Sequence, residues 1–464
     1  MDARVVRHEQ PSLVLPAAVN PAYFTGISPA GAAMLQRLIH HPHAPRFRNQ
    51  SGHRLLPNEL NQLDGYIRKA LIQSIASPYT SLGMVPDFLN KLLKDTQEQV
   101  PAFAGALPVE FAEIPTTCRA DLSRDFTRYV PQPLPLERLI CFSTSGTTGH
   151  PLTIPSYPMV AARYQAFHRR ALAHFGIVPC AKQGEVAVAL VGSQARCFTY
   201  ASINPLQAEA GLVKLNLNEA DWHHPADRSR YLDDLAPELI TGDPISLMAL
   251  ADLPLQHQPK AILSTSMQML DGTRQYLERR FACPVLDIYS MNEAGPIAVF
   301  DPMLGGHVLL QPELWVEIVD EAGRLLPLGE RGEITLSGGF NPWLPLRRYR
   351  TGDYAAMALV GQMPVLMGLS GRPPVRFCTV DGCWINNVDI SQALQHFMLQ
   401  QFSLHQAHDG SLRLQIVGDI DLLALRQQMT HLLGNWPLNI ETRPALGEKI
   451  IQYTSDFLAE TCRV

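Results

Sequence analysis

A loop rich in hydroxyl groups and glycine is the clearest chemical feature of this sequence. Residues 143–149 are all serine, threonine or glycine, and they follow the apolar run Leu139–Phe142. A flexible loop after a strand presents backbone N–H groups and hydroxyls together, and this combination suits phosphate oxygens. The loop is not a Walker loop, because it lacks the G-x-x-x-x-G-K-[ST] spacing. A polar turn made of turn-forming residues is the alternative, and the loop taken alone does not decide between the two.

The loop resembles the phosphate loop of the adenylate-forming (ANL) superfamily, and within it that of the phenylacetate-CoA ligase branch. The family pattern is S-S-G-T-T-G-x-P, and Thr144–Pro151 matches it with Thr in place of the first Ser. Upstream, Ile114–Leu122 is similar to P-x-T-x-K-x-D-L, and downstream Asp287–Glu293 resembles D-I-Y-G-x-[ST]-E. The remaining matches are Gly329–Glu333, Pro345–Asp353, Gly371 with Arg372, and Pro444–Ile450. Such co-linear agreement is hard to produce by chance.

The resemblance implies a site for ATP. The residues that would bind the phosphates are Ser143, Thr144, Ser145, Gly146, Thr147, Thr148 and Gly149. Tyr289 would stack on adenine, Asp353 would bind the ribose diol, and Arg372 would meet a phosphate or the ribose. The catalytic residues would be Lys449, Thr148 and Glu293, and Glu293 would also be the Mg²⁺ ligand.

The residue types fit these roles, although each has an ordinary alternative. The face of Tyr289 suits a flat apolar ring, and the alternative is a core aromatic. Glu293 is a hard oxygen anion of the kind that Mg²⁺ prefers, and the alternative is a surface carboxylate. Asp353 can accept two hydrogen bonds from a diol, and the alternative is a turn aspartate. For Arg372 the alternative is a salt bridge between domains.

Lys449 stands where the family has its catalytic lysine. A lysine there would stabilise the substrate carboxylate and the α-phosphate during attack. Glu448 departs from the family spelling and could pair with Lys449, which would make the lysine a solvated surface charge. We favour the catalytic role.

The resemblance implies an ATP-dependent acid–thiol ligase that uses Mg²⁺. A carboxylate would attack the α-phosphorus of ATP, pyrophosphate would leave, and the acyl adenylate would pass to the thiol of CoA or of a carrier protein. The small C-terminal domain would reorient between the two half-reactions and exclude water. The partners implied are a small carboxylic acid, an aryl or related one in this branch, and CoA or an acyl carrier protein, in a chain that could form a homodimer.

The predicted acyl pocket lies between the 186–205 region, Ser264–Met269 and the Tyr289–Ala298 loop. Its wall residues are Phe198, Tyr200, Ser264, Thr265, Ser266, Gly295 and Pro296. Ser264–Met267 occupies the position of the family's G-A-E-P, so substrate preference has room to diverge. Pro373 and Pro374 follow Arg372 where the family has an aspartate hinge, and proline restricts the torsions that a hinge must change.

Two other functions stay open at this point. One is an adenylating enzyme of specialised metabolism that passes the acyl group to an amine or stops at the adenylate, and the altered hinge motivates it. The other is a degenerate member that binds nucleotide or an acyl ligand without turnover. A serine hydrolase is disfavoured, because no G-x-S-x-G occurs.

The elements that must position these residues read as an α/β fold. Strand-like runs such as Val186–Val191, Ile262-Leu263 and Val285–Tyr289 alternate with helical patterns near Ala226–Leu235 and Gly272–Arg280. This alternation favours largely buried strands. Upstream, apolar spacing from Asn58 to Ile75 predicts an amphipathic helix.

A β-rich subregion and a smaller domain follow. Short strands are predicted at Leu314–Val319, Gly332–Leu336 and Tyr354–Leu359, between Gly- and Pro-rich turns. After residue 371, alternation over Leu412–Ile416 predicts a strand, and the spacing from Leu422 to Leu433 predicts a helix closed by Gly434. We therefore expect a large N-terminal α/β adenylation domain, 1–371, and a small mobile α+β C-terminal lid domain, 372–464. The former would comprise a helical cover, about 1–110, and the ATP and acyl site, 111–371.

Composition sets the outer limits. The 464 residues are 46% apolar and 17% charged with a formal charge of -5, which gives no electrostatic footprint for nucleic acid or an anionic membrane. The eight cysteines are scattered and contain no C-x-x-C pair, as expected for a reducing cytoplasm. No apolar run approaches the length needed to cross a bilayer. We expect a soluble, cytoplasmic protein with no nucleic-acid or membrane partner.

Overall fold

The computed structural model describes residues 23–80, 85–105, 110–132, 134–143, 152–267, 269, 271–370, 375–394, 397, 399, 401–418, 420–444 and 453–457. These residues form two compact units. The first unit comprises the described residues up to Gln62 together with Pro179–Leu263 and Gln275–Val285. The second unit comprises the described residues of Leu63–Val178, Ser264–Arg274 and the chain from Leu286 onward.

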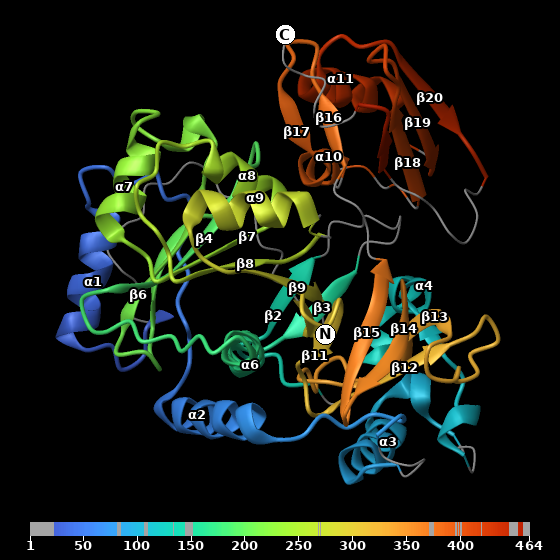
Figure 1. The fold of residues 1–464 in the computed structure, drawn as a ribbon. Helices are drawn as coiled ribbons and strands as arrows, with labels where there is room; N and C mark the ends of the chain where they lie inside the picture. The colour runs from blue at the N-terminus through green and yellow to red at the C-terminus, as the bar shows by residue number, and fades with distance from the viewer. Residues whose placement is uncertain are drawn as a thin grey trace. The chain divides into compact units, whose positions relative to one another are not determined.

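The first unit is built on strands covered by helices. The strands lie in the order β5-β6-β4-β7-β8, with β4 parallel to β6 and β7, and β5 antiparallel to β6. Helix α8 packs on β4 and β7, and α1 packs on β5 and β6 (Figure 1). The bounds are α1 Pro29–Ile39, β4 Val186–Gly192, β5 Tyr200–Asn204, β6 Ala210–Asn216, the 3-10 turn η5 Glu219–Asp221, α7 Asp227–Leu235, β7 Leu239–Gly242, α8 Pro244–Ala251, β8 Ala261–Ser264 and α9 Asp271–Phe281. Of the last two elements, β8 belongs to this unit up to Leu263 and α9 from Gln275 onward.

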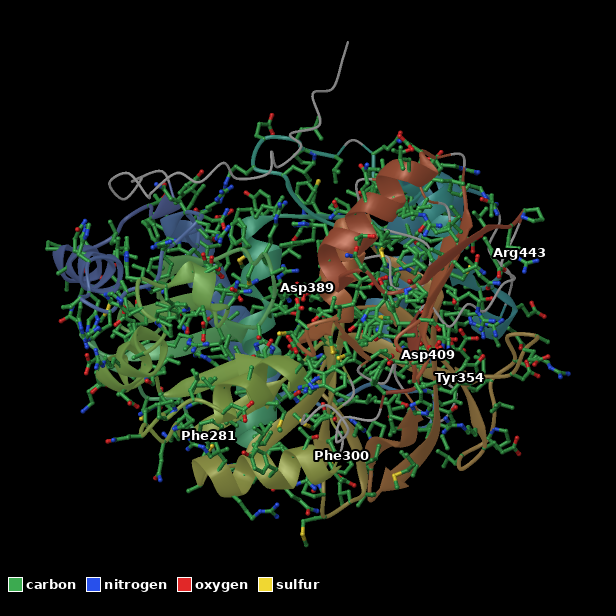
Figure 2. The ribbon with its side chains drawn as sticks, turned by 90° about the horizontal axis from the view of Figure 1, so that it is seen from above. Phe281, Phe300, Tyr354, Asp389, Asp409 and Arg443 are labelled. Atoms are coloured by element: carbon green, nitrogen blue, oxygen red, sulfur yellow. The ribbon has the colours of Figure 1, made fainter. Side chains whose placement is uncertain are left out.

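Sequence pattern and structure agree closely in this unit. The apolar run at Val186 is β4. Five of its seven residues are buried, and it pairs with a parallel strand on each side, as expected for a strand covered on two faces. The predicted helix at Ala226–Leu235 is α7, which ends at Ala236 in the left-handed conformation. The predicted helix at Gly272–Arg280 is α9, and Phe281 at its end is buried (Figure 2).

The larger part of the second unit is a sheet whose strands lie in the order β12-β13-β14-β15-β11-β10-β9, with the short strand β1 parallel to β14. The bounds of the helices are α2 Pro57–Ile72, α3 Asp87–Gln99, η2 Pro101–Phe103, η3 Phe111–Glu113, α4 Arg119–Arg124, η4 Phe126–Tyr129, α5 Pro158–Ala162 and α6 Tyr164–His174. The bounds of the strands are β1 Thr117–Cys118, β2 Ile140–Ser143, β3 Thr153–Ser156, β9 Val285–Met291, β10 Gly295–Asp301, β11 Gly306–Leu309, β12 Leu314–Val319, β13 Arg331–Gly338, β14 Leu346–Val360 and β15 Met363–Ser370.

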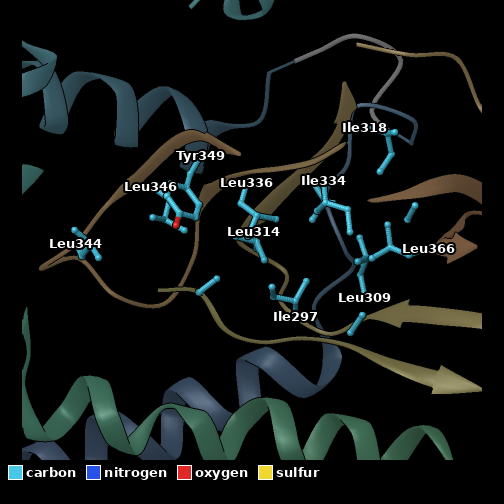
Figure 3. Packing of buried hydrophobic residues seen from close by; sticks show 14 of the residues in the cluster. Ile297, Leu309, Leu314, Ile318, Ile334, Leu336, Leu344, Leu346, Tyr349 and Leu366 are labelled. Atoms are coloured by element: carbon cyan, nitrogen blue, oxygen red, sulfur yellow. The ribbon is translucent and has the colours of Figure 1, made fainter. Parts of the chain in front are cut away.

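The hydrophobic core of this sheet comes from side chains of successive strands. Figure 3 shows Ile297, Leu309, Leu336, Tyr349 and Leu366, which come from β10, β11, β13, β14 and β15. Tyr349 belongs to this core and is 1% exposed, yet it carries a polar hydroxyl. Burial of such a side chain requires a hydrogen-bond partner for that hydroxyl.

Residues 375–457 have a hydrophobic core of their own. A sheet in the order β20-β19-β18-β21 carries α10 and α11 (Figure 1), and β16 pairs with β17. The bounds are β16 Arg376–Cys378, β17 Trp384–Asn386, α10 Asn387–Leu394, β18 Gln401–Gln406, β19 Leu412–Val417, α11 Leu422–Leu433, β20 Leu438–Thr442 and β21 Tyr453–Ser455. The fold is therefore the expected one, a large α/β part with a β-rich subregion followed by a small α+β part.

Two details of the C-terminal part follow from local chemistry. Helix α11 begins after Asp421, whose carboxylate accepts from the N–H groups of Leu423 and Ala424, and it ends at Gly434 with a φ of 83°, as the sequence predicts. In the turn between β18 and β19, the carboxylate of Asp409 accepts hydrogen bonds from the hydroxyl and the N–H of Ser411 (Figure 2). These hydrogen bonds lower the pKa of Asp409.

One strand differs from its prediction. The sequence predicts a strand at Tyr354–Leu359, whereas β14 begins at Leu346 and includes the polar run Arg347–Asp353. The apolar pattern did not predict the first half of β14 because arginine side chains are usually exposed to solvent. Arg348 is instead paired with Glu317 on β12, and Arg350 with Glu333 on β13, the strand next to β14. Positive φ angles at Arg348 and Gly352 interrupt the regular alternation further.

Candidate functional site

Several predicted site residues lie outside the described residues. They are Thr144, Ser145, Gly146, Thr147, Thr148, Gly149, Arg372 and Lys449. Ser143 is the last residue of β2, which pairs antiparallel with β3. The strand predicted before the hydroxyl-rich segment is therefore present, and the chain returns to pair with it as β3. Its role in binding phosphate stays a prediction, and so do the roles of Arg372 and Lys449.

Tyr289 and Asp353 come together. The hydroxyl of Tyr289 on β9 donates to Oδ2 of Asp353 on β14, and the two atoms are 2.8 Å apart. Burial raises the pKa of Tyr289 well above its usual value, and the neighbouring Asp353 raises it further, so this hydroxyl stays protonated and donates. The Tyr289 ring packs beside the hydrophobic core of the sheet. The two residues assigned to adenine and ribose thus share one polar contact between separate strands.

The backbone around Asp353 is held on both sides. The N–H of Asp353 donates to the hydroxyl of Thr351 at 3.1 Å, and this hydroxyl donates to the carbonyl of Ile334 at 2.9 Å. The N–H of Gly352 donates to Oε1 of Glu333 at 2.9 Å. Glu333 belongs to the matched segment Gly329–Glu333, so two segments of the resemblance meet here.

Glu293 is buried and paired, and the surface-carboxylate alternative is wrong. It lies in the turn between β9 and β10 and is 2% exposed. Its Oε1 accepts from Nη1 of Arg119 at 2.7 Å and from the hydroxyl of Tyr349 at 3.1 Å. Burial raises the pKa of Tyr349 well above its usual value, and the Glu293 carboxylate acts in the same direction. Tyr349 is therefore a neutral donor to a carboxylate that Arg119 balances in charge.

The upstream segment explains how Arg119 reaches this place. Thr117 and Cys118 form β1 in parallel register with Tyr349 and Arg350 of β14. The Cys118 N–H donates to Oδ2 of Asp121 at 2.9 Å in a capping box, which begins α4 at Arg119. The pairing of β1 thus places Arg119 beside the strand that carries Tyr349.

The turn that carries Glu293 is fixed by a buried amide. Nε2 of Gln311 donates to the carbonyls of Ala294 and Pro296, at 2.5 and 2.8 Å. Gly295 has a φ of 67°, and a Cβ at this position would lie 2.7 Å from the ring of Phe340. Only glycine satisfies both the torsion and the packing.

Sequence reasoning gave no role to Arg119, Tyr349 or Gln311. Arg119 and Tyr349 lie inside matched segments, and their positions within these segments were the available signal. Gln311 lies outside every matched segment, and only the packing of the turn reveals it.

The predicted acyl-pocket residues divide between the two units. Phe198 and Tyr200 belong to the first unit, with ring centroids 5.6 Å apart, and burial raises the pKa of Tyr200 to about 12. Ser264 ends β8 with its hydroxyl buried and without a hydrogen-bond partner among the described residues. Thr265 and Ser266 follow it, and Gly295 and Pro296 begin β10. The pocket itself stays a prediction.

The donor set around Glu293 fits Mg²⁺. Within the described ranges, Oε2 of Glu293 receives no hydrogen bond, so one hard oxygen stays available. The same part of the chain contains no group of three or more His, Cys, Asp or Glu side chains that could hold a metal ion. A single carboxylate suits Mg²⁺, which takes its other ligands from water and nucleotide phosphates.

Among the described residues, no helix has the length and apolar character needed to cross a bilayer.

The chain has the fold of adenylate-forming ligases. It is similar to 2-hydroxyisobutyryl-CoA ligase in complex with 2-HIB-AMP and CoA in the thioesterification state, with a TM-score of 0.50 and 18% identity over 87% of this chain and 91% of that one. An amide bond synthetase from Marinactinospora thermotolerans matches with a TM-score of 0.39 and 17% identity over 68% of this chain and 69% of that one. No family model and no curated protein matches the sequence.

Proposed function

We propose that this chain is an ATP-dependent ligase that adenylates an aryl or related carboxylic acid and transfers the acyl group to the thiol of CoA or of a carrier protein. One observation carries the proposal. Three segments that resemble this family at separate places in the sequence converge on one site through the bonds of Tyr289 to Asp353 and of Arg119 and Tyr349 to Glu293.

The described residues would bind and orient the nucleoside. Tyr289 offers an aromatic ring whose hydroxyl is already engaged by Asp353, so the ring cannot turn freely. Asp353 has a second carboxylate oxygen and can accept from a ribose hydroxyl. The bonds of Thr351 and Glu333 to the backbone fix Asp353 before the ligand arrives. Preorganisation of this kind lowers the entropy lost on binding.

Glu293 would hold Mg²⁺ through Oε2, while Arg119 and Tyr349 keep Oε1 in place. When bound, the ion would neutralise charge on the nucleotide phosphates. The loop from Ser143 to Gly149 would bind those phosphates, and Lys449 would bring a cation to the reacting carboxylate. Both assignments rest on the sequence.

The identity of the acceptor depends on residues beyond Gly371. A thiol acceptor is our first choice, because the chain contains the small α+β part that would act as a lid. The Pro373-Pro374 pair motivates an amine as the second choice, because it restricts the hinge on which the thiol half-reaction would depend.

The decisive experiment is isotope exchange between pyrophosphate and ATP with a panel of aryl, cyclic and short aliphatic carboxylic acids. We expect exchange that requires both one class of acid and Mg²⁺. A complete lack of acid-dependent exchange would contradict the enzyme proposal and favour a protein that binds the ligand without turnover. Product formation with CoA, with a carrier protein and with simple amines then identifies the acceptor.

A further inference from the structure

A second reactive cluster lies in the first unit and contains none of the predicted site residues. Cys180, Glu238 and Lys260 meet where β7 and β8 begin, because Glu238 directly precedes β7 and Lys260 directly precedes β8. The N–H of Lys260 donates to the carbonyl of Glu238 at 2.8 Å, and the N–H of Glu238 donates to the carbonyl of Val186 at 2.8 Å. The backbone of the sheet therefore fixes both residues.

The Glu238 carboxylate is held by five donors. Its Oε1 accepts from the N–H of Cys180 at 2.7 Å, and its Oε2 accepts from the N–H of Ala181 at 2.8 Å and from Nε2 of Gln207 at 3.1 Å. The thiol of Cys180 and the ammonium of Lys260 also donate to Oε1, at 3.2 and 3.3 Å. The hydrogen bonds to Glu238 lower its pKa against the effect of burial, so it stays an anion.

The thiol and the amine are in contact with each other. Nζ of Lys260 lies 3.3 Å from Sγ of Cys180. This separation is within the roughly 3–3.5 Å that characterises reacting atoms before a bond forms. Glu238 orients both groups through one oxygen atom. Cys180 is exposed and the Lys260 side chain is 41% exposed, so a small oxidant has access.

We propose that Cys180 and Lys260 form a covalent sulfenamide cross-link when the protein meets hydrogen peroxide. The sulfur of Cys180 loses its proton and attacks one peroxide oxygen, the O–O bond breaks, and a sulfenic acid and one water result. Lys260 gives an ammonium proton to solvent and attacks the sulfur with its lone pair. The S–O bond breaks, and the hydroxyl leaves with a nitrogen proton as a second water. One thiol, one amine and one peroxide thus yield one S–N bond and two waters, with sulfur oxidised and peroxide reduced.

The cross-link would form at the end of β8 opposite to the predicted acyl-pocket residue Ser264. Lys260 lies at the amino end of β8 and Ser264 lies at its carboxyl end. The four residue steps of strand from Lys260 to Ser264 span roughly 13 Å. Ligands of open α/β sheets bind at the carboxyl ends of the strands. The cluster is therefore a modification site that is independent of the proposed ligase reaction.

The experiment treats the full chain with one to a few equivalents of hydrogen peroxide and examines the digested protein by mass spectrometry. We expect a linked peptide pair that contains Cys180 and Lys260 and is lighter than the sum of the two peptides by two hydrogen atoms. Dithiothreitol should separate the pair. Oxidation of Cys180 to sulfinic acid without any linked pair would overturn the proposal.

Two controls isolate the role of the amine. Lys260→Arg keeps the positive charge but removes the nucleophilic amine, so a dimedone-trapped sulfenic acid should replace the cross-link. Cys383 is an exposed thiol for which no lysine contact occurs among the described residues, and it should oxidise without a link to lysine. A linked pair at Cys180 in Lys260→Arg, or an equal yield of lysine links at Cys383, would refute the proposed geometry.

Discussion

Two buried ion pairs in the second unit differ in how completely their carboxylates are used. Arg348 and Glu317 are each 2% exposed and bond through both carboxylate oxygens, at 3.1 and 3.2 Å. Arg348 also donates to the carbonyls of Ala112, Ile114 and Gly323. In the second pair, Arg119 is 16% exposed and donates to Oε1 of Glu293 at 2.7 Å.

This difference indicates that Arg348 and Glu317 form a structural pair, whereas Arg119 and Glu293 form a pair that can take part in function. Burial of charge is costly, and a pair repays this cost when hydrogen bonds satisfy its remaining donors and acceptors. Arg348 meets this condition and joins β14 to β12 and to the segment before β1. Glu293 keeps one oxygen without a hydrogen bond from the described residues, beside a partly accessible arginine. This oxygen is the one that a bound Mg²⁺ could take as a ligand.

The largest expected effect comes from breaking the saturated pair. Arg348→Met should lower the free energy of unfolding by about 3–5 kcal/mol, because it leaves Glu317 as a buried and unpaired charge. Urea denaturation followed by circular dichroism measures the loss. The double variant Arg348→Met/Glu317→Met should recover most of it. If the single variant were as stable as the parent, the pair would not be structural.

Breaking the open pair should affect catalysis more than stability. Glu293→Gln should slow pyrophosphate exchange on the order of 100-fold, because the charged oxygen proposed for Mg²⁺ is lost. The exchange assay measures this together with a urea curve. Glu313→Gln is the matched control, since Glu313 forms an exposed pair with Lys69 in the same unit. Equal exchange rates in the two variants would contradict the role of Glu293.

Arg119 should act as a positioning residue. Arg119→Gln should lower exchange roughly 10-fold, because Oε1 of Glu293 loses its charged donor and the carboxylate is held less firmly. Removal of this positive charge should also lower the Mg²⁺ concentration needed for half-maximal exchange. Arg119→Lys should restore the parental Mg²⁺ dependence. An unchanged Mg²⁺ dependence in Arg119→Gln would reduce Arg119 to a packing role.

The smallest effect is a pH dependence specific to the saturated pair. Burial raises the pKa of Glu317 above its usual value of 4.5, although Arg348 opposes the shift. As the pH rises above 4.5, the unfolded state therefore releases this proton before the folded state does, and the contribution of Glu317 to stability falls. Loss of Arg348 should raise the pKa further.

The stability difference between Arg348→Met and the parent should thus shrink by about 1 kcal/mol as the pH falls from about 7 to about 5. Urea midpoints at several pH values measure this change. Arg348→Met/Glu317→Gln lacks the titrating group and should show a difference from the parent that is less dependent on pH. A difference that grows on acidification would reverse the assigned sign.

The sequence predicted the regular elements because the apolar residues of each recur with the single period of a helix or of a strand. Helices α7, α9 and α11 and strands β4, β12 and β19 lie where that spacing placed them. The prediction failed at the first half of β14, whose arginines lie in the interior of the sheet. Their burial depends on Glu317 and Glu333, which come from other strands, and no local pattern contains that information.

The candidate site shows the same division. Motif order alone identified Tyr289, Glu293 and Asp353 as candidates, because residue type and spacing are properties of the chain. That Tyr289 donates to Asp353, and that Arg119 and Tyr349 share one oxygen of Glu293, was decided only when β1, β9 and β14 came together in the folded unit. Hydrogen bonds require separations near 3 Å and defined angles, and only packing in three dimensions sets these between residues far apart in the sequence.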